Sequence, residues 1–172
     1  MEMTDICPAT AWAALEEDIH RRFGLNARIY DSKGFSFTGH VTWGNRLCPA
    51  VKASPQAVSA ICSLAQTAMA AQARDSRAAV IDQCDAGLYK ICVPVFAGDD
   101  FVGVAGGCGA LPQDGEIESF LLEKSAGLSE DQTAELSLDV PVMDEAAAAE
   151  AAKYIEERVA ALLDAYRAKQ NS

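Results

Sequence analysis

Cysteine is the residue type in this chain whose placement could support chemistry. Five of the six cysteines fall between residues 48 and 108, namely Cys48, Cys62, Cys84, Cys92 and Cys108. None belongs to a CxxC pair, which argues against a zinc ribbon and a thioredoxin motif. Cys48, Cys84 and Cys108 each stand beside turn-forming or glycine-rich residues. Loops next to strand ends often carry binding groups, so these three thiols are expected at a site.

Four converging thiolates would suit zinc or an iron–sulfur cluster. The residues expected to hold such a metal or Fe–S centre are Cys48, Cys62, Cys84 and Cys108. The alternative is that each thiol packs as a small hydrophobe, because free cysteine is among the most buried residue types. With no local pair, only the fold decides whether the thiols converge. Cys92 joins the group or lines the other side of the sheet, and Cys7 is expected only to pack.

Aromatic residues near the predicted strand ends indicate a pocket for a small organic ligand, although aromatics in strands are more often plain core. They are Phe35, Phe37, Trp43, Tyr89 and Phe96. Glycines around Cys108 would let the backbone approach a ligand closely. The residues expected to contact this ligand are Trp43, Gly87, Tyr89 and Gly106.

A thiol enzyme would need a base, and only His20 and His40 are available. His20 is expected near the C-terminal end of the first helix, where a basic side chain is favourable and exposed to solvent. His40 precedes Cys48 closely enough to approach it, but no nucleophile signature surrounds either residue. No catalytic residue is therefore assigned. A cysteine-dependent redox enzyme or electron-transfer protein is the second hypothesis, and it requires an exposed thiol of low pKa.

Hydrophobic periodicity predicts the elements that position these residues. Helices are expected over 10–24, from Ser54-Pro55 onward, over 117–122, after Ser129 and over 144–169. Strands are expected over 27–31, 35–38, 78–82, 88–97 and 101–105, with a loop or strand over 39–49. Short hairpin connections favour an α+β fold: a central antiparallel sheet of about five strands with flanking helices, PAS/GAF-like, with a long C-terminal helix.

The bulk composition narrows the function. A chain of 172 residues is long enough for one domain, which is taken as 1–172 with a sheet and cysteine-bearing core over 26–109. The net charge of −11 argues against a nucleic-acid partner. No signal peptide, apolar membrane-length run or basic amphipathic helix is found, so no membrane partner is expected. The expected location is the cytoplasm, where thiols stay reduced.

The segment from Asn26 to Gly109 resembles the PocR ligand-sensing domain, a PAS-like module of prokaryotic signalling proteins. The resemblance rests on the strand-turn-strand from Ile29 to Gly34, on Leu47-Cys48 and on the helix-borne Cys62. Further along, it rests on the segments Cys84-Asp85-Ala86-Gly87-Leu88, Val93-Pro94-Val95-Phe96 and Val102-Gly103-Val104-Ala105-Gly106-Gly107.

The resemblance implies small-molecule sensing, with Cys48, Cys62 and Cys84 near the binding site. Such domains are usually fused to an output domain, whereas this chain is expected to act as a stand-alone module without catalytic turnover. Cys92 and Cys108 are additional to the family's cysteine set, which favours a metal or Fe–S centre. The C-terminal helix, with Ile155 and Val159 on one stripe, would dock on a signalling partner, pair with a second copy or pack on its own sheet.

Overall fold

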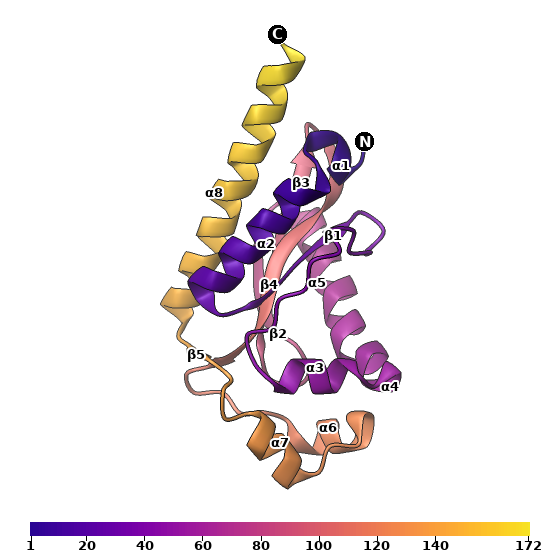
Figure 1. Cartoon of the computed structure of the whole chain (residues 1–172), viewed down its shortest axis with the longest axis vertical. Helices are drawn as coiled ribbons and strands as arrows, with labels where there is room; N and C mark the ends of the chain where they lie inside the picture. The colour runs from indigo at the N-terminus through magenta and orange to yellow at the C-terminus, as the bar shows by residue number, and fades with distance from the viewer.

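The computed structural model describes residues 1–172 (Figure 1). Its helices are α1 (Met3–Ile6), α2 (Ala9–Phe23), α3 (Leu47–Lys52), α4 (Pro55–Ala57), the π-helical turn η1 (Val58–Cys62), α5 (Ser63–Ser76), α6 (Ser119–Ala126), α7 (Glu130–Leu136) and α8 (Glu145–Gln170). Its strands are β1 (Asn26–Asp31), β2 (Val80–Gln83), β3 (Tyr89–Ala97), β4 (Asp100–Pro112) and β5 (Val142–Met143).

An open sheet in the order β1-β4-β3-β2 forms the centre of the molecule. All neighbours on this path are antiparallel, and the short β5 pairs in parallel with the end of β4. β3 and β4 form the predicted hairpin, whose turn contains Gly98 at a φ of 67°. The prediction of an α+β fold, with a five-stranded sheet, flanking helices and a long C-terminal helix, is confirmed.

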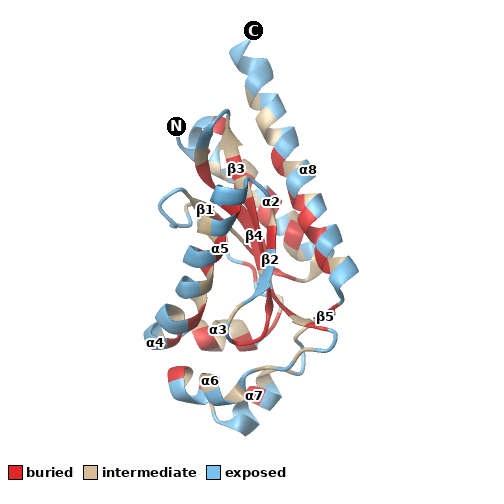
Figure 2. Cartoon of the chain, turned by 180° about the vertical axis from the view of Figure 1, so that it is seen from behind, coloured by how far each residue is buried: buried red, intermediate tan, exposed pale blue.

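Helices cover the two faces of the sheet differently (Figures 1 and 2). α2 and α8 pack on one face, where Trp12, Ile29, Ile91 and Ile155 belong to a hydrophobic cluster of 21 buried residues. The connected helices α3, α4, η1 and α5 lie on the other face (Figure 1). The alternation predicted for β3 is confirmed on the first face, because Tyr89, Ile91, Val93 and Val95 all belong to that cluster.

Local signals set the helix ends. Gly24 adopts the left-handed conformation that closes α2. The Ser54 side chain accepts a hydrogen bond from the Ala57 backbone N–H, with Pro55 at the first helical position, as predicted. Ser129 and Gln132 form the predicted capping box of α7.

Three local predictions were wrong. The 39–49 segment ends in the helix α3, so Cys48 lies in a helical turn and not in a loop. The return strand over 35–38 reduces to one bridge between Tyr30 and Ser36. The glycine-rich run around Cys108 is the middle of β4 and not a turning point, because β1 and β3 supply backbone hydrogen-bond partners on both sides. Tertiary pairing therefore outweighs the low strand propensity of glycine here.

The C-terminal helix packs on its own chain. Small and β-branched residues of α8 are buried in the 21-residue hydrophobic cluster on the α2 and α8 face of the sheet. They include Ala148, Ala152, Ile155 and Val159. Leu162 and Tyr166, in the later part of the helix, remain partly buried against the same cluster. No helix of the molecule combines the length and apolar character needed to span a membrane.

Candidate functional site

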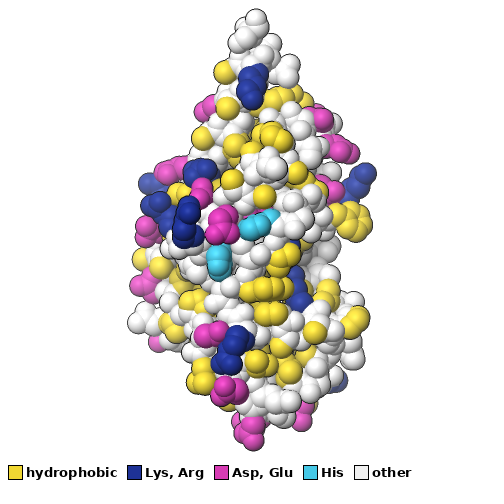
Figure 3. Space-filling view, in the orientation of Figure 1, with side chains coloured by type: hydrophobic (Ala, Val, Ile, Leu, Met, Phe, Trp, Pro, Cys, Tyr) yellow, Lys and Arg dark blue, Asp and Glu magenta, His cyan; other side chains and the backbone are white.

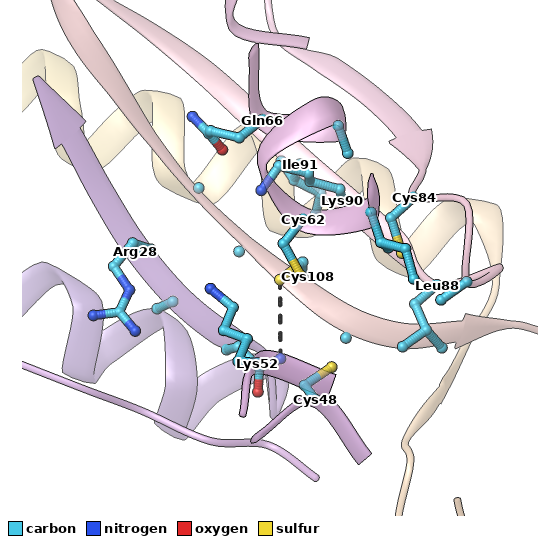
Figure 4. A pocket seen from close by; sticks show the side chains of 18 of the residues that line it. Arg28, Cys48, Lys52, Cys62, Gln66, Cys84, Leu88, Lys90, Ile91 and Cys108 are labelled. Carbon is cyan, nitrogen blue, oxygen red and sulfur yellow. Dashed lines mark hydrogen bonds between the residues drawn. The ribbon is translucent and has the colours of Figure 1, made fainter. Parts of the chain in front are cut away.

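A cavity of about 60 Å³ lies between the sheet and the α3, η1 and α5 helices (Figure 4). Most of the lining residues are hydrophobic, and they include Leu47 and Val51 of α3 and Ile61 of η1. About 10–15 Å³ is enough for one water by this kind of measure, so the space is several times that minimum. The cavity is thus the size of a small organic molecule.

Five of the six thiols line this cavity. Each of these thiols comes from a different element: Cys48 from α3, Cys62 from η1, Cys84 from the segment after β2, Cys92 from β3 and Cys108 from β4. The structure thus brings together all four thiols predicted to form a site, with Cys92 as a fifth. Cys7 lies elsewhere, partly buried against the α2 and α8 cluster.

Cys108 occupies the middle of the cavity floor because of the strand register. It pairs with Asn26 of β1 on one side and Lys90 of β3 on the other. The Asn26 Nδ2 donates a weak hydrogen bond to the Cys108 Sγ at 3.9 Å, drawn as a dashed line in Figure 4. Side chains of paired residues share a face of the sheet, so these three groups meet at the floor.

Asn45 ties α3 to the end of β4. Its Oδ1 accepts a hydrogen bond from the Cys48 backbone N–H at 2.7 Å. Its Nδ2 donates to the Cys48 Sγ at 3.5 Å and to the Gly109 carbonyl at 3.0 Å. Gly109 has a φ of 96°, and a Cβ there would lie 2.5 Å from the Asn26 Nδ2. Only glycine suits the backbone at this position. The Asn45 hydrogen bonds to Gly109 and Cys48 thus hold Cys48 close to the cavity floor.

The segment between β1 and α3 is held in place by a buried carboxylate. Glu16 of α2 is fully buried, and its Oε1 accepts a hydrogen bond from the Ile29 N–H at 2.8 Å. Its Oε2 accepts a second one from the Thr38 hydroxyl at 2.7 Å. Burial raises the pKa of Glu16, and these hydrogen bonds partly oppose the shift. Trp43 of this segment lines the cavity, so Glu16 positions that wall indirectly.

The pKa of four of the five cavity thiols is raised. Burial, reinforced by the neighbouring Cys108, raises the pKa of Cys48 to about 12. Burial also raises the pKa of Cys62, Cys84 and Cys92. A reactive cysteine needs a lowered pKa, so these four thiols give no support to the hypothesis of a redox enzyme.

Four polar side chains that the sequence analysis did not single out also line the cavity: Arg28, Lys52, Gln66 and Lys90. Lys90 stands in the centre of β3 and is 8% exposed. Lys52 extends from the end of α3 on the opposite wall, with its Nζ 5.9 Å from the centre of the Trp43 ring. A lysine within a mostly apolar strand was the available signal for Lys90, because a buried Lys is rare unless it has a role.

The residues predicted to contact an organic ligand divide into two groups. Trp43 and Gly106 line the cavity. Tyr89 points to the opposite face of the sheet, into the α2 and α8 cluster. Gly87 lies in the turn before β3, where a Cβ would meet the Glu116 carbonyl oxygen at 2.2 Å, so the close approach of that segment requires glycine. Of the other aromatics, Phe35 is exposed.

Neither histidine lies at the thiols. Both are visible on the surface in Figure 3, where basic side chains are interspersed with acidic ones. The His40 Nε2 lies 3.1 Å from the Glu17 carboxylate, and the His20 Nδ1 lies 3.0 Å from the Leu25 carbonyl oxygen. No group of three or more His, Cys, Asp or Glu side chains is arranged to hold a metal ion. The cysteines share one cavity but do not form a coordination sphere.

These features define an α+β sensor-type domain with an internal ligand-sized cavity. Residues 5–165 match the family model described as the sensory domain found in PocR, which covers nearly the whole chain. The chain therefore belongs to the PocR sensory-domain family, as the sequence resemblance indicated, and the match extends well beyond residues 26–109. No match was found among curated proteins or solved structures.

Proposed function

We propose that this chain senses a small molecule in the cavity between the sheet and α3, η1 and α5. Membership of a sensory-domain family supports ligand sensing in signalling as the general role. The observation that carries the proposal is a cavity lined by apolar side chains and five thiols from separate elements. Mostly apolar cavities with a few polar groups are typical of small-molecule sites.

The proposed signal passes through the sheet to α8. Along β3, Lys90 and Cys92 line the cavity, whereas Val93 and Val95 pack in the cluster that includes α8. A ligand that shifts β3 or β4 would therefore change the packing of α8. The recipient would be a signalling partner or a second copy of the chain docked on this helix.

A variant that fills the cavity would test this proposal. Ala65 of α5 lines the cavity, so Ala65→Leu should fill part of it. We expect ligands found by a thermal-shift screen to stabilise the wild type and to lose that effect in Ala65→Leu. The matched control is Ala161→Leu on the exposed side of α8, which should respond like the wild type. Equal responses in both variants would place the ligand elsewhere.

A metal or Fe–S centre held by Cys48, Cys62, Cys84 and Cys108 is the second candidate. All four thiols line one cavity, which favours it. Their present arrangement does not fit a metal ion, since no three of them are grouped as ligands. Binding would require the thiols to lose their protons and to move closer together.

Metal analysis separates the two candidates. The measurement is the absorbance spectrum and the iron, sulfide and zinc content of protein purified without oxygen. A metal-holding site predicts bound metal that is lost in Cys48→Ser and in Cys84→Ser but kept in Cys7→Ser, because only Cys7 lies outside the cavity. Metal-free protein, or equal retention in all three variants, would leave the small organic ligand as the occupant.

A further inference from the structure

The charged side chains that line the cavity are basic, whereas the net charge of the whole chain is negative. The protein has a net charge of −11, with 25 acidic residues and 14 basic ones. The cavity lining nevertheless contains Arg28, Lys52 and Lys90 and no Asp or Glu. Arg28 donates a hydrogen bond to the His40 carbonyl at 2.9 Å, and its charge lowers the pKa of Glu16. Lys52 and Lys90 remain as cations without a carboxylate at an apolar site, which indicates that a negative charge belongs there.

Lys90 is a buried cation without a carboxylate partner. It forms no ion pair, and its nearest aromatic neighbour is the Tyr30 ring, with the Nζ 5.8 Å from the ring centre. Its register partner on β2 is Asp82, which is exposed and accepts a hydrogen bond from the Gln83 N–H instead. Taking an unpaired ammonium group out of water is costly, so a second group is expected to compensate it when the site is filled.

Gln66 of α5 is a second unpartnered group at the same site. Its side chain is 8% exposed, and neither its Nε2 nor its Oε1 has a hydrogen-bond partner. Buried amides are almost always hydrogen-bonded, because an unsatisfied one loses its bonds to water. Figure 4 shows Gln66 and Lys52 among the side chains around the cavity. A ligand oxygen would satisfy the Gln66 amide.

An open groove gives a ligand access to these groups. It runs along α5 and β1 and shares residues with the cavity, namely Arg28, Tyr30, Lys52, Cys62, Gln66 and Val104. The cations Arg28 and Lys52 are therefore common to the groove and the cavity, and Lys90 lies only on the inner side. Positive charge at an entrance favours the approach of anions.

We propose that the ligand is a small organic anion, a carboxylate with a short apolar body. This inference rests on the proposed function, because it assigns the chemical class of the ligand in the same cavity. The carboxylate accepts charge-assisted hydrogen bonds from the Lys90 and Lys52 ammonium groups and one from the Gln66 Nε2. The body packs on Leu47, Val51 and Ile61 and on the cavity thiols. A short apolar body suits a cavity of about 60 Å³ that opens into the groove.

The first test compares three probes of nearly the same shape: propionate, propionamide and 1-propanol. Binding is measured by calorimetry and thermal shift at constant ionic strength, with sodium chloride as the reference salt. We expect propionate to bind about tenfold or more tightly than either neutral probe, because only propionate pairs with the cations. Chloride at equal concentration should not reproduce the effect.

Variants then connect the binding to the named side chains. Lys90→Met keeps the length of the side chain and removes its charge, and Gln66→Leu removes the amide. Each should weaken propionate binding, by about tenfold to a hundredfold for Lys90→Met, and leave 1-propanol binding nearly unchanged. The control Lys124→Met removes an exposed charge on α6 that does not line the cavity, and it should bind propionate like the wild type. Lys52→Met, at the partly exposed entrance, is a second variant that gives the same comparison.

The outcomes separate this inference from the proposed function. If a neutral probe binds as well as propionate, or if Lys90→Met and Lys52→Met keep full propionate affinity, the anionic ligand is wrong and the sensing cavity stands. If carboxylates of two to six carbons all fail to bind, the inference is again overturned. If neutral molecules of the same size also fail to bind in that screen, the proposed function is overturned as well.

Discussion

The two faces of the sheet are built from the same strands but serve different ends. On the α2 and α8 face, aliphatic and aromatic side chains form a dry cluster of 21 buried residues. On the α3, η1 and α5 face, thiols, glycines, two lysines and an arginine surround a cavity. Because side chains alternate along a strand, neighbouring residues such as Cys92 and Val93 belong to different faces.

The difference shows how one small sheet can be both stable and open to a ligand. The packed face supplies burial of apolar area, the dominant stabilising term in folding. The cavity face contains a buried Gln66 amide without hydrogen-bond partners, which lowers stability, and a mostly buried Lys90 without an ion pair. Such features persist at functional sites because the rest of the fold compensates for them.

The two tryptophans give the strongest test of this comparison. Trp12 is fully buried in the α2 and α8 cluster, and its Nε1 donates a hydrogen bond to the Met3 carbonyl at 2.9 Å. Trp12→Ala should lower the free energy of unfolding by about 3–5 kcal/mol, measured by urea denaturation. Trp43 on the cavity side is 37% exposed, and Trp43→Ala should cost no more than about 1 kcal/mol. Similar losses in both variants would contradict the division into two faces.

Lys90→Met should change stability in the opposite direction. Replacing a buried unpaired ammonium group with an apolar side chain of similar length should raise the free energy of unfolding by about 1–4 kcal/mol in ligand-free protein. Thermal and urea denaturation both measure this change. The control Lys124→Met, at an exposed position, should stay within about 0.5 kcal/mol of the wild type. A loss of stability in Lys90→Met would mean that Lys90 is a structural residue.

A thiol on the cavity face should also make the protein lose stability at alkaline pH. Burial raises the pKa of Cys48 to about 12 from an ordinary value of 9.0, so the folded protein holds this proton more tightly than the unfolded chain does. The stabilisation that comes from the protonated Cys48 thiol is complete at pH values below the ordinary pKa of the unfolded chain. It is lost as pH rises through the raised pKa of the folded state. Cys48→Ser, which cannot ionise in this range, should lose less stability than the wild type when urea midpoints are compared above about pH 9. Parallel curves for the two proteins would show that the Cys48 thiol is not desolvated.

The smallest expected effect concerns Glu16, which joins the packed face to the segment that carries Trp43. Burial raises the pKa of Glu16, so the folded state binds its proton more tightly than the unfolded chain. Its contribution to stability is therefore present at low pH and declines as pH rises through the raised pKa. Glu16→Gln keeps an acceptor for the Ile29 N–H and removes the titration, so its stability should decline less than that of the wild type as pH rises above the ordinary pKa of a Glu side chain. An unchanged pH profile would contradict a raised pKa at this position.

Elements with strong local signals were predictable from the sequence. The α2 helix with Gly24 at its end, the Ser54-Pro55 start and the Ser129 capping box are confirmed, because each depends on residues within a few positions of one another. The α3 helix was missed, and the strand over 35–38 was overestimated. In both places short polar and glycine-containing sequences leave the outcome to contacts with distant residues.

The candidate site was predictable in its residue types but not in its boundaries. The four thiols Cys48, Cys62, Cys84 and Cys108 were selected from their positions beside turns and on a helix face, and all line one cavity. Lys90, Lys52 and Gln66 were not selected, because a charged or amide residue on a strand or helix usually faces solvent. Only the register of β3 against β4, which sets Lys90 opposite Cys108, shows that this lysine is buried.

The sequence by itself determined the family, the α+β class, the helix ends and the alternation along β3, because motifs, capping residues and hydrophobic periodicity act over short distances. Only the tertiary structure decided that the glycine-rich run around Cys108 is a central strand and that five thiols share one cavity. It also decided that cations without carboxylates surround that cavity. These properties depend on strand register and on helices packed across the sheet, which join residues far apart in the chain.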